Sequence, residues 1–194
     1  MRTTNVADSV LKAALDLFAT QGYATTSVQQ IVEAAGVTKG AMYHYFQSKD
    51  DLLFAIYDRM LTLQRRHLDD IVAAGGPPLE VIRAACVDVV ETSIDLLPEG
   101  TVFFRSMHML SPARHQEVTR RRRDYHDAFA ALVEKGQAEG VVRTDVPRSV
   151  LIAHFYSDVH YLSYWYSPSG PETKTEVAQQ LADLFLRSIT VEDG

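Results

Sequence analysis

The chain has 194 residues, of which 46% are apolar, and it carries a formal net charge of −6. This length suits one large or two small domains with a substantial core. The negative net charge excludes a protein that coats nucleic acid indiscriminately. The charges of residues 1–50 sum to zero, so the acidity lies in the remainder and only the first segment is electrostatically tolerable beside phosphates.

The single cysteine and the N-terminal segment narrow the class of protein further. Cys86 cannot form an internal disulfide, which suits a reducing cytoplasm. Its apolar neighbours, among them Ile82 and Val90, indicate a core position. The N-terminus is not typical of a signal peptide, and no apolar run approaches the length of a membrane span. We therefore expect a cytoplasmic protein with no membrane partner.

Helical signals run through the whole chain, and no segment predicts a convincing strand. The clearest breaks lie near Gly22, at residues 75–78, before Pro98, at Gly140 and at residues 167–171. Between the breaks, apolar residues recur at helical spacing. We therefore predict an all-α fold of about nine helices. They cover about residues 10–22, 27–35, 38–46, 48–74, 79–97, 99–110, 111–139 and 145–166, with a last helix ending near Ile189.

Residues 25–49 carry the most informative pattern in the chain. Ser27 and Gln30 fit a capping box that opens a short helix. Gly36 suits a tight turn, after which Thr38 can cap a second short helix. Two short helices joined in this way are typical of a helix-turn-helix, whose second helix enters the DNA major groove.

The second helix has an outer face suited to DNA. If Met42 and Phe46 pack inward, Lys39, Gly40 and Tyr43 point outward. A lysine can reach guanine acceptors or a phosphate, and a glycine lets the backbone approach the duplex closely. Threonine and serine at a helix N-terminus suit phosphate anchoring, and a lysine beyond the second helix can reach a further phosphate. The candidate DNA-binding residues are Thr26, Ser27, Thr38, Lys39, Gly40, Ala41, Tyr43, His44, Tyr45 and Lys49. The alternative is a helical corner whose threonines only cap.

The run from Phe18 to Leu53 resembles the N-terminal domain of the TetR family of bacterial transcriptional repressors. The matching elements include Gly22-Tyr23, Ala35-Gly36-Val37, Lys39-Gly40 and Ser48-Lys49. The resemblance implies an all-helical homodimer that binds near-palindromic double-stranded operator DNA and releases it when a small molecule binds. It also implies a DNA-binding domain over residues 1–47 and an effector-binding and dimerisation domain over residues 48–194.

The last predicted helices carry the expected dimer surface. The resemblance implies an interface of four helices, in which each subunit contributes its last two helices. The alternative is that the apolar stripe on the last helix belongs to the core of one chain. The apolar stripe consists of Val177, Ala178, Leu181, Leu184, Phe185 and Ile189.

Aromatic and arginine residues suggest an effector pocket in the C-terminal domain. Four successive arginines, residues 120–123, cover nearly the whole circumference of a helix, so at least one of them points inward and needs an anion. That anion is either an acidic group of the effector or the carboxylate of Asp88, Glu91 or Asp95. Aromatics at helical spacing can equally be plain core. The candidate ligand-binding residues are Phe103, Phe104, Met107, Arg121, Arg122, Tyr125, Tyr161 and Trp165.

The segment of residues 103–111 and the arginine-rich helix are similar to TetR-type regulators of fatty-acid and sterol breakdown. This similarity implies a long or polycyclic acyl-CoA as effector. The alternatives are a drug-like ligand that controls an efflux gene, a DNA-binding dimer without an effector, and an enzyme or carrier that has lost its DNA role. No catalytic motif and no cofactor motif is present, so we expect no enzyme. His154 and Asp158 lack a third metal ligand, so we expect no metal site.

Overall fold

The computed structural model describes residues 5–191. In these residues the only extended pairing is one isolated antiparallel bridge, between Val142 and Thr190, so the all-α prediction is confirmed. The helices are α1 (Val6–Gln21), α2 (Val28–Ala35), α3 (Lys39–Tyr45), α4 (Lys49–Ala74), α5 (Pro78–Asp95), α6 (Leu97–Ser106), the 3-10 helix η1 (Met107–Met109), α7 (Pro112–Ala138), α8 (Arg148–His160), α9 (Leu162–Trp165) and α10 (Lys174–Ile189).

The chain forms two compact units. Unit 1 runs to Leu61 and includes residues 98–121, and unit 2 holds residues 62–97 and continues from Arg122. Helices α4 and α7 therefore contribute residues to both units. No helix within residues 5–191 is long and apolar enough to cross a membrane.

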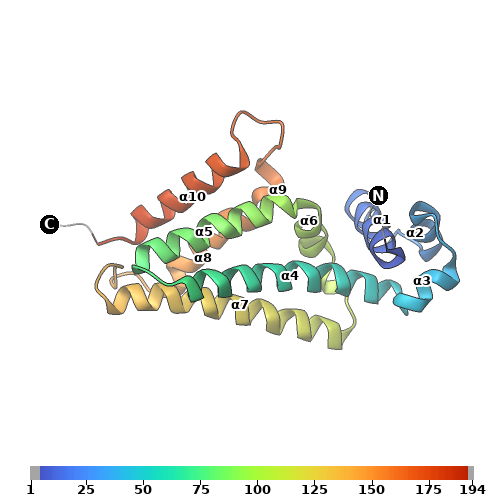
Figure 1. Ribbon diagram of the computed structural model, residues 1–194, viewed down its shortest axis with the longest axis horizontal. Helices are drawn as coiled ribbons and strands as arrows, with labels where there is room; N and C mark the ends of the chain where they lie inside the picture. The colour runs from blue at the N-terminus through green and yellow to red at the C-terminus, as the bar shows by residue number, and fades with distance from the viewer. Residues whose placement is uncertain (1–4, 192–194) are drawn as a thin grey trace. The chain divides into compact units, whose positions relative to one another are not determined.

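Unit 1 begins with a trio of helices, α1 to α3, drawn in blue in Figure 1. Asn5 caps α1, and Gly22 ends it with a φ of 91°, a value that favours glycine. Val10, Ala14 and Phe18 lie on the buried face of α1. Their spacing of four residues confirms the predicted stripe.

Helix α6 is held to α4 inside unit 1 by a buried tyrosine. The Tyr57 hydroxyl donates to the Val102 carbonyl at 3.0 Å, and the Tyr57 ring meets the Phe103 ring edge-on at 4.9 Å. Burial raises the pKa of Tyr57, so its hydroxyl stays a proton donor. These contacts fix α6 against the first half of α4.

Unit 2 is built around α5, and α10 packs along it in the opposite direction (Figure 1). The apolar core between its helices includes Cys86, Phe129, Phe155 and Phe185, so the predicted core role of Cys86 is confirmed. Three polar contacts join α5 to α10 at its edge, namely Arg83 with Asp183 at 2.9 Å, Glu91 with Thr175 at 3.0 Å and Asp95 with Lys174 at 2.7 Å.

Two predicted helices are divided in the structure. The predicted helix over 99–110 is α6 followed by η1, a tightened final turn. The predicted helix over 145–166 is interrupted at Tyr161, whose ψ of 0° leaves the helical range, and resumes as α9. Val159 and Leu162 are both buried across the break, so the apolar periodicity does not reveal it.

Candidate nucleic-acid interface

The turn between α2 and α3 forms as the sequence predicts. The Ser27 hydroxyl accepts from the Gln30 N–H at 3.2 Å, and the Gln30 side chain accepts from the Ser27 N–H at 2.8 Å. Gly36 ends α2 in the left-handed region with a φ of 67°, which a Cβ would strain. The Thr38 hydroxyl accepts from the Ala41 N–H at 3.1 Å and so caps α3. The predicted capping box, turn and cap are confirmed.

Helix α3 buries one side and leaves the other open. Met42 is fully buried, whereas Tyr43 and Tyr45 are 44% and 47% exposed. Lys39, Gly40 and His44 are also exposed, and Ala41 is half-buried. The helix therefore offers a cation, ring hydroxyls and an imidazole at its accessible surface, and Lys39, Gly40, Tyr43 and His44 point outward as the sequence predicted.

Gly40 is not required by the protein's own packing. A Cβ added at this position would meet only the Thr38 hydroxyl oxygen, at 3.9 Å, an ordinary contact. The backbone conformation of Gly40 does not demand glycine either, since its φ is not positive. The empty space beside Gly40 lies on the exposed face of α3 and leaves room for a close approach from outside.

The side chain of Thr26, a predicted DNA-binding residue at the N-terminus of α2, is turned into the protein. Thr26 is 1% exposed, and its hydroxyl donates to the Gly22 carbonyl at 2.8 Å while it accepts from Gln21 Nε2 at 3.1 Å. This hydroxyl closes the bend between α1 and α2 instead. The neighbouring Ser27 is exposed, but its hydroxyl takes part in the capping box. A sequence pattern for a helix N-terminus does not distinguish a residue turned outward from one turned into the bend.

Lys49, predicted to contact a phosphate, makes internal contacts in the structure. Its ammonium group donates to the carbonyls of Tyr23 and Thr26, both at 2.8 Å, and lies 4.3 Å from the centre of the Tyr23 ring. Burial lowers the pKa of Lys49. Lys49 therefore ties the first turn of α4 to the bend between α1 and α2.

The predicted ligand-binding residues differ in burial and belong to both units. Phe103 and Tyr125 are core residues, 2% and 6% exposed. Phe104, Tyr161 and Trp165 are at least 46% exposed, and Met107 is half-buried. Unit 1 holds Phe103, Phe104, Met107 and Arg121, and unit 2 holds Arg122, Tyr125, Tyr161 and Trp165.

The arginine run divides as helix geometry requires, and two of its members pair with carboxylates other than the three predicted. Arg121 pairs with Asp58 of α4, and Arg120 pairs with Glu117 at 2.8 Å. Arg122 is half-buried, and burial lowers its pKa. The three carboxylates expected to face the run are engaged elsewhere in unit 2. Asp88 pairs with His67, Glu91 accepts from Thr175, and Asp95 pairs with Lys174.

Unit 2 contains a cavity of about 530 Å³ between α7 and α8. The rings of His126 and His160 lie 4.3 and 5.7 Å from that of Tyr156, one of its lining residues. Burial lowers the pKa of His160 to about 4, helped by nearby Arg122 and His126. Burial and then Arg122 lower the pKa of His126. Both imidazoles are therefore neutral at pH 7, where each can donate one hydrogen bond and accept another.

The cavity combines apolar and polar groups at a size typical of small-molecule sites. Sequence reasoning missed it because its histidines lie on different helices at no characteristic spacing. In the described part of the chain, no group of three or more metal-ligating side chains comes together. The cavity is lined by His126, Asp127, Ala130, Arg148, Ser149, Ile152, Ala153, Tyr156, Ser157 and His160.

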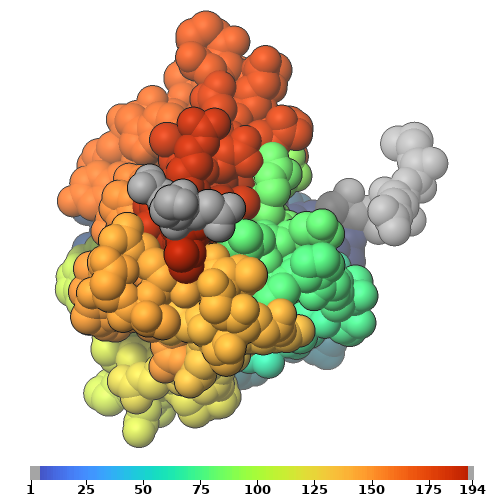
Figure 2. All heavy atoms as spheres, turned by 90° about the vertical axis from the view of Figure 1, so that its left-hand side faces the viewer, coloured from blue at the N-terminus to red at the C-terminus, as the bar shows by residue number. Residues whose placement is uncertain are grey.

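Helices α8 to α10 leave apolar side chains at the surface of unit 2. Figure 2 shows the surface of α8 and α9 in orange and of α10 in red, and α8 packs against α10. The predicted dimerisation stripe on α10 mostly enters the core: Val177, Ala178, Phe185 and Ile189 are buried, whereas Leu184 is 62% exposed. Large exposed apolar residues of this part of the chain also include Val150, Tyr161, Tyr164 and Trp165.

Two family profiles match the chain. Residues 10–56 match the profile described as bacterial regulatory proteins, tetR family, and residues 75–189 match that of the tetracyclin repressor-like C-terminal domain. Among curated proteins, the transcriptional repressor KstR2 of Mycobacterium tuberculosis is 27% identical over 186 residues, 94% of this chain and 92% of KstR2.

Solved structures agree with these matches. The regulator PfmR of Thermus thermophilus is 27% identical, with a TM-score of 0.85 over 95% of this chain and 99% of PfmR. The ketosteroid regulator KstR2 of Mycobacterium tuberculosis is 25% identical, with a TM-score of 0.86 over 94% of each chain. AibR, solved with isovaleryl coenzyme A and operator DNA, is similar in fold, with a TM-score of 0.80 at 24% identity over 95% of this chain and 98% of AibR.

Proposed function

Because the chain belongs to the TetR family of bacterial regulatory proteins, we propose that it is a homodimeric repressor that binds a near-palindromic operator and releases it when a small effector binds. Its relatives are transcriptional regulators and not enzymes, in agreement with the sequence prediction. The observation that carries the proposal is the exposed outer face of α3, the second helix of a fully formed helix-turn-helix.

In this proposal, Lys39, Tyr43 and His44 face a major groove. The Gly40 backbone lies against the duplex, and Thr38, Ala41 and Tyr45 contact its edges or phosphates. Ser27 contributes through the N-terminus of α2. One short helix buries too little surface for genomic specificity, so two subunits read half-sites about 34–36 Å apart. Residues 1–47 form the DNA-binding domain, and residues 48–194 bind the effector and the partner.

The dimer surface in this proposal is the outer side of α8 to α10. Large apolar side chains such as Leu184 and Trp165 are 62% and 50% exposed there, and exposed apolar side chains that gather on one surface mark interaction sites. A second copy of the chain presenting the same surface would cover them in a two-fold arrangement.

The effector in this proposal is a lipid-derived acid or acyl-CoA that places apolar groups in the cavity of unit 2. The cavity offers Ile152 and Ala130 to an apolar body, and Arg148 and two neutral histidines to a polar end. KstR2 is described as a ketosteroid regulator, which favours a polycyclic compound over a drug-like cation.

Operator binding is tested with the DNA upstream of the protein's own gene in a gel-shift titration. We expect a specific, salt-dependent complex that competitor DNA of unrelated sequence does not remove. A protein that binds its upstream DNA as weakly as DNA of unrelated sequence would contradict the proposal.

Effector binding is tested by thermal-shift screening of acyl-CoAs, steroid acids and cationic drugs. We expect a thioester or acid to raise the unfolding midpoint and to release DNA. Ala153→Trp, which fills the cavity from its exposed side, abolishes this response, whereas His154→Trp on the same helix, outside the cavity lining, keeps it. A full response by the Ala153→Trp protein would show that the effector does not bind in this cavity.

A further inference from the structure

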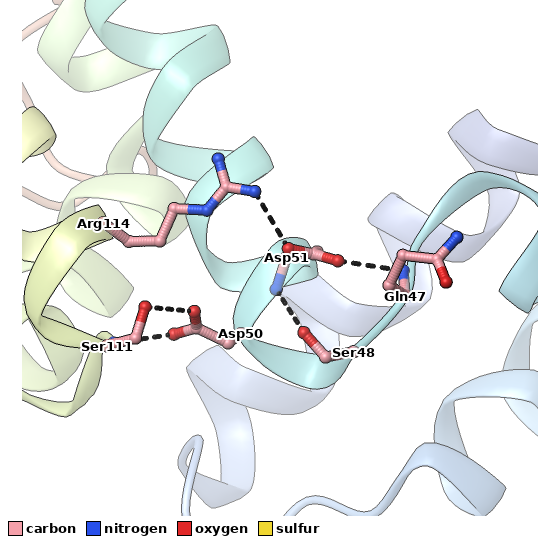
Figure 3. Close-up of polar contacts among 6 residues, drawn as sticks. All are labelled: Gln47, Ser48, Asp50, Asp51, Ser111 and Arg114. Atoms are coloured by element: carbon pink, nitrogen blue, oxygen red, sulfur yellow. Dashed lines mark hydrogen bonds and ion pairs between the residues drawn. The ribbon is translucent and has the colours of Figure 1, made fainter.

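The start of α4 meets the start of α7 inside unit 1 through two neighbouring carboxylates (Figure 3). Asp50 accepts from both the N–H and the hydroxyl of Ser111, at 3.0 and 2.7 Å. Ser111 immediately precedes α7, so the Asp50 carboxylate lies at the positive end of that helix. Asp50 therefore holds the first turn of α7 by hydrogen bonds and by charge.

Asp51 also joins the start of α4 to the start of α7, and it connects both to the segment that follows α3, the recognition helix of the proposed function. One of its oxygens accepts from the Arg114 guanidinium at 3.0 Å, and the other accepts from the Gln47 N–H at 2.9 Å. Its own N–H donates to the Ser48 hydroxyl at 3.1 Å, so Asp51 completes the cap of α4. The Arg114 guanidinium also lies 4.1 Å from the centre of the Phe54 ring. A single carboxylate thus bonds to α7 and to the short link between α3 and α4.

The polar path continues into α3. The Gln47 side-chain amide donates to the Tyr43 carbonyl at 3.3 Å, on the recognition helix itself. Hydrogen bonds therefore run from Arg114 through Asp51 and Gln47 to Tyr43 without leaving unit 1. α7 also supplies His126, Asp127 and Ala130 to the cavity of unit 2, so one continuous helix carries both a cavity wall and the end of this path.

We propose that Asp50 and Asp51 are positioning residues that set the recognition helix α3 according to where the first turn of α7 lies. This inference rests on the proposed function. When α7 keeps Ser111 and Arg114 on the two carboxylates, Gln47 and α3 are held in the arrangement that reads DNA. A displacement of α7 breaks these charge-assisted bonds and releases α3, so operator affinity falls without any change in the residues that face DNA.

The test compares Arg114→Met with Arg114→Lys and with Arg105→Met, a matched loss of an exposed arginine on α6 in the same unit. Arg114→Met is expected to weaken promoter binding about two- to fivefold, as the loss of one partly exposed ion pair would. Arg114→Lys restores part of the affinity, and Arg105→Met leaves it unchanged. Because Arg114 does not face the duplex in this proposal, the salt dependence of binding keeps its wild-type slope.

A double-mutant cycle and hydrogen exchange separate positioning from other roles. Arg114→Met combined with Asp51→Asn is expected to bind DNA no worse than the weaker single variant, since both remove the same link. Amide exchange of residues 39–46 rises in Arg114→Met and not in Arg105→Met, with or without DNA. An Arg114→Met protein that binds DNA with wild-type affinity, or one whose salt slope falls by about one as for a lost phosphate contact, would overturn the inference. If the wild-type protein does not bind its promoter specifically, the proposed function is overturned, and this inference is overturned with it.

Discussion

Lys39 is the residue on which direct DNA contact is most simply tested, because it is exposed at the start of α3. We expect Lys39→Ala to weaken operator binding and to reduce the salt slope by about one, since one cation near the phosphates is lost. The measurement is a binding titration at several salt concentrations. Lys135→Ala, an exposed lysine of α7 in unit 2, serves as the control and should change neither quantity.

Gly40 separates DNA contact from folding at a single position. Because an added Cβ would make only an ordinary contact with the Thr38 hydroxyl, Gly40→Ala should keep the free energy of unfolding or raise it by up to about 1 kcal/mol through better helix propensity. The same methyl group should obstruct the duplex and lower operator affinity. Denaturant unfolding and gel-shift titration on one preparation test both statements. Unchanged affinity would mean that no close backbone approach occurs at Gly40.

At the scale of elements, Lys49 shows how α4 supports the helix-turn-helix that precedes it. Its ammonium group bonds to two carbonyls of the bend between α1 and α2. Lys49→Met leaves those carbonyls without their charged donor, so we expect the free energy of unfolding to fall by about 1–3 kcal/mol. Lys12→Met, at an exposed position of α1, should cost less than about 0.5 kcal/mol. Equal losses in the two variants, measured by chemical denaturation, would contradict the structural role of Lys49.

At the scale of the whole molecule, the half-buried His160 predicts a pH dependence of stability. His160 has a pKa of about 4 in the folded chain, against an ordinary value of 6.5. Between these values the unfolded chain binds more protons than the folded one, so the free energy of unfolding should fall as the pH drops from 6.5 towards 4. His160→Gln should flatten this fall, and His154→Gln, on the exposed side of the same helix, should leave it unchanged. Denaturant titrations at pH 7 and pH 5 measure the effect.

The proposed dimer can be broken at one exposed apolar residue. Leu184→Glu places a charge on the outer side of α10, where the leucine is 62% exposed, so the fold of unit 2 should survive. We expect the variant to sediment as a monomer and to lose most of its operator affinity, because one half-site alone is bound weakly. Val72→Glu, an exposed position near the end of α4, is the control. A Leu184→Glu protein that stays dimeric would show that the dimer interface does not lie on this surface.

The sequence by itself determined the elements whose causes are local. The capping box at Ser27, the glycine turn at Gly36 and the cap at Thr38 are set by a few neighbouring residues, so their pattern predicted the helix-turn-helix and its outer face. The tertiary structure alone decided which polar groups remain free for a partner. Thr26 and Lys49 bond to backbone carbonyls of the bend between α1 and α2, and Arg121 pairs with Asp58. The two histidines of the cavity lie on separate helices, α7 and α8. These contacts join residues far apart in the chain, and helical periodicity carries no information about such pairings.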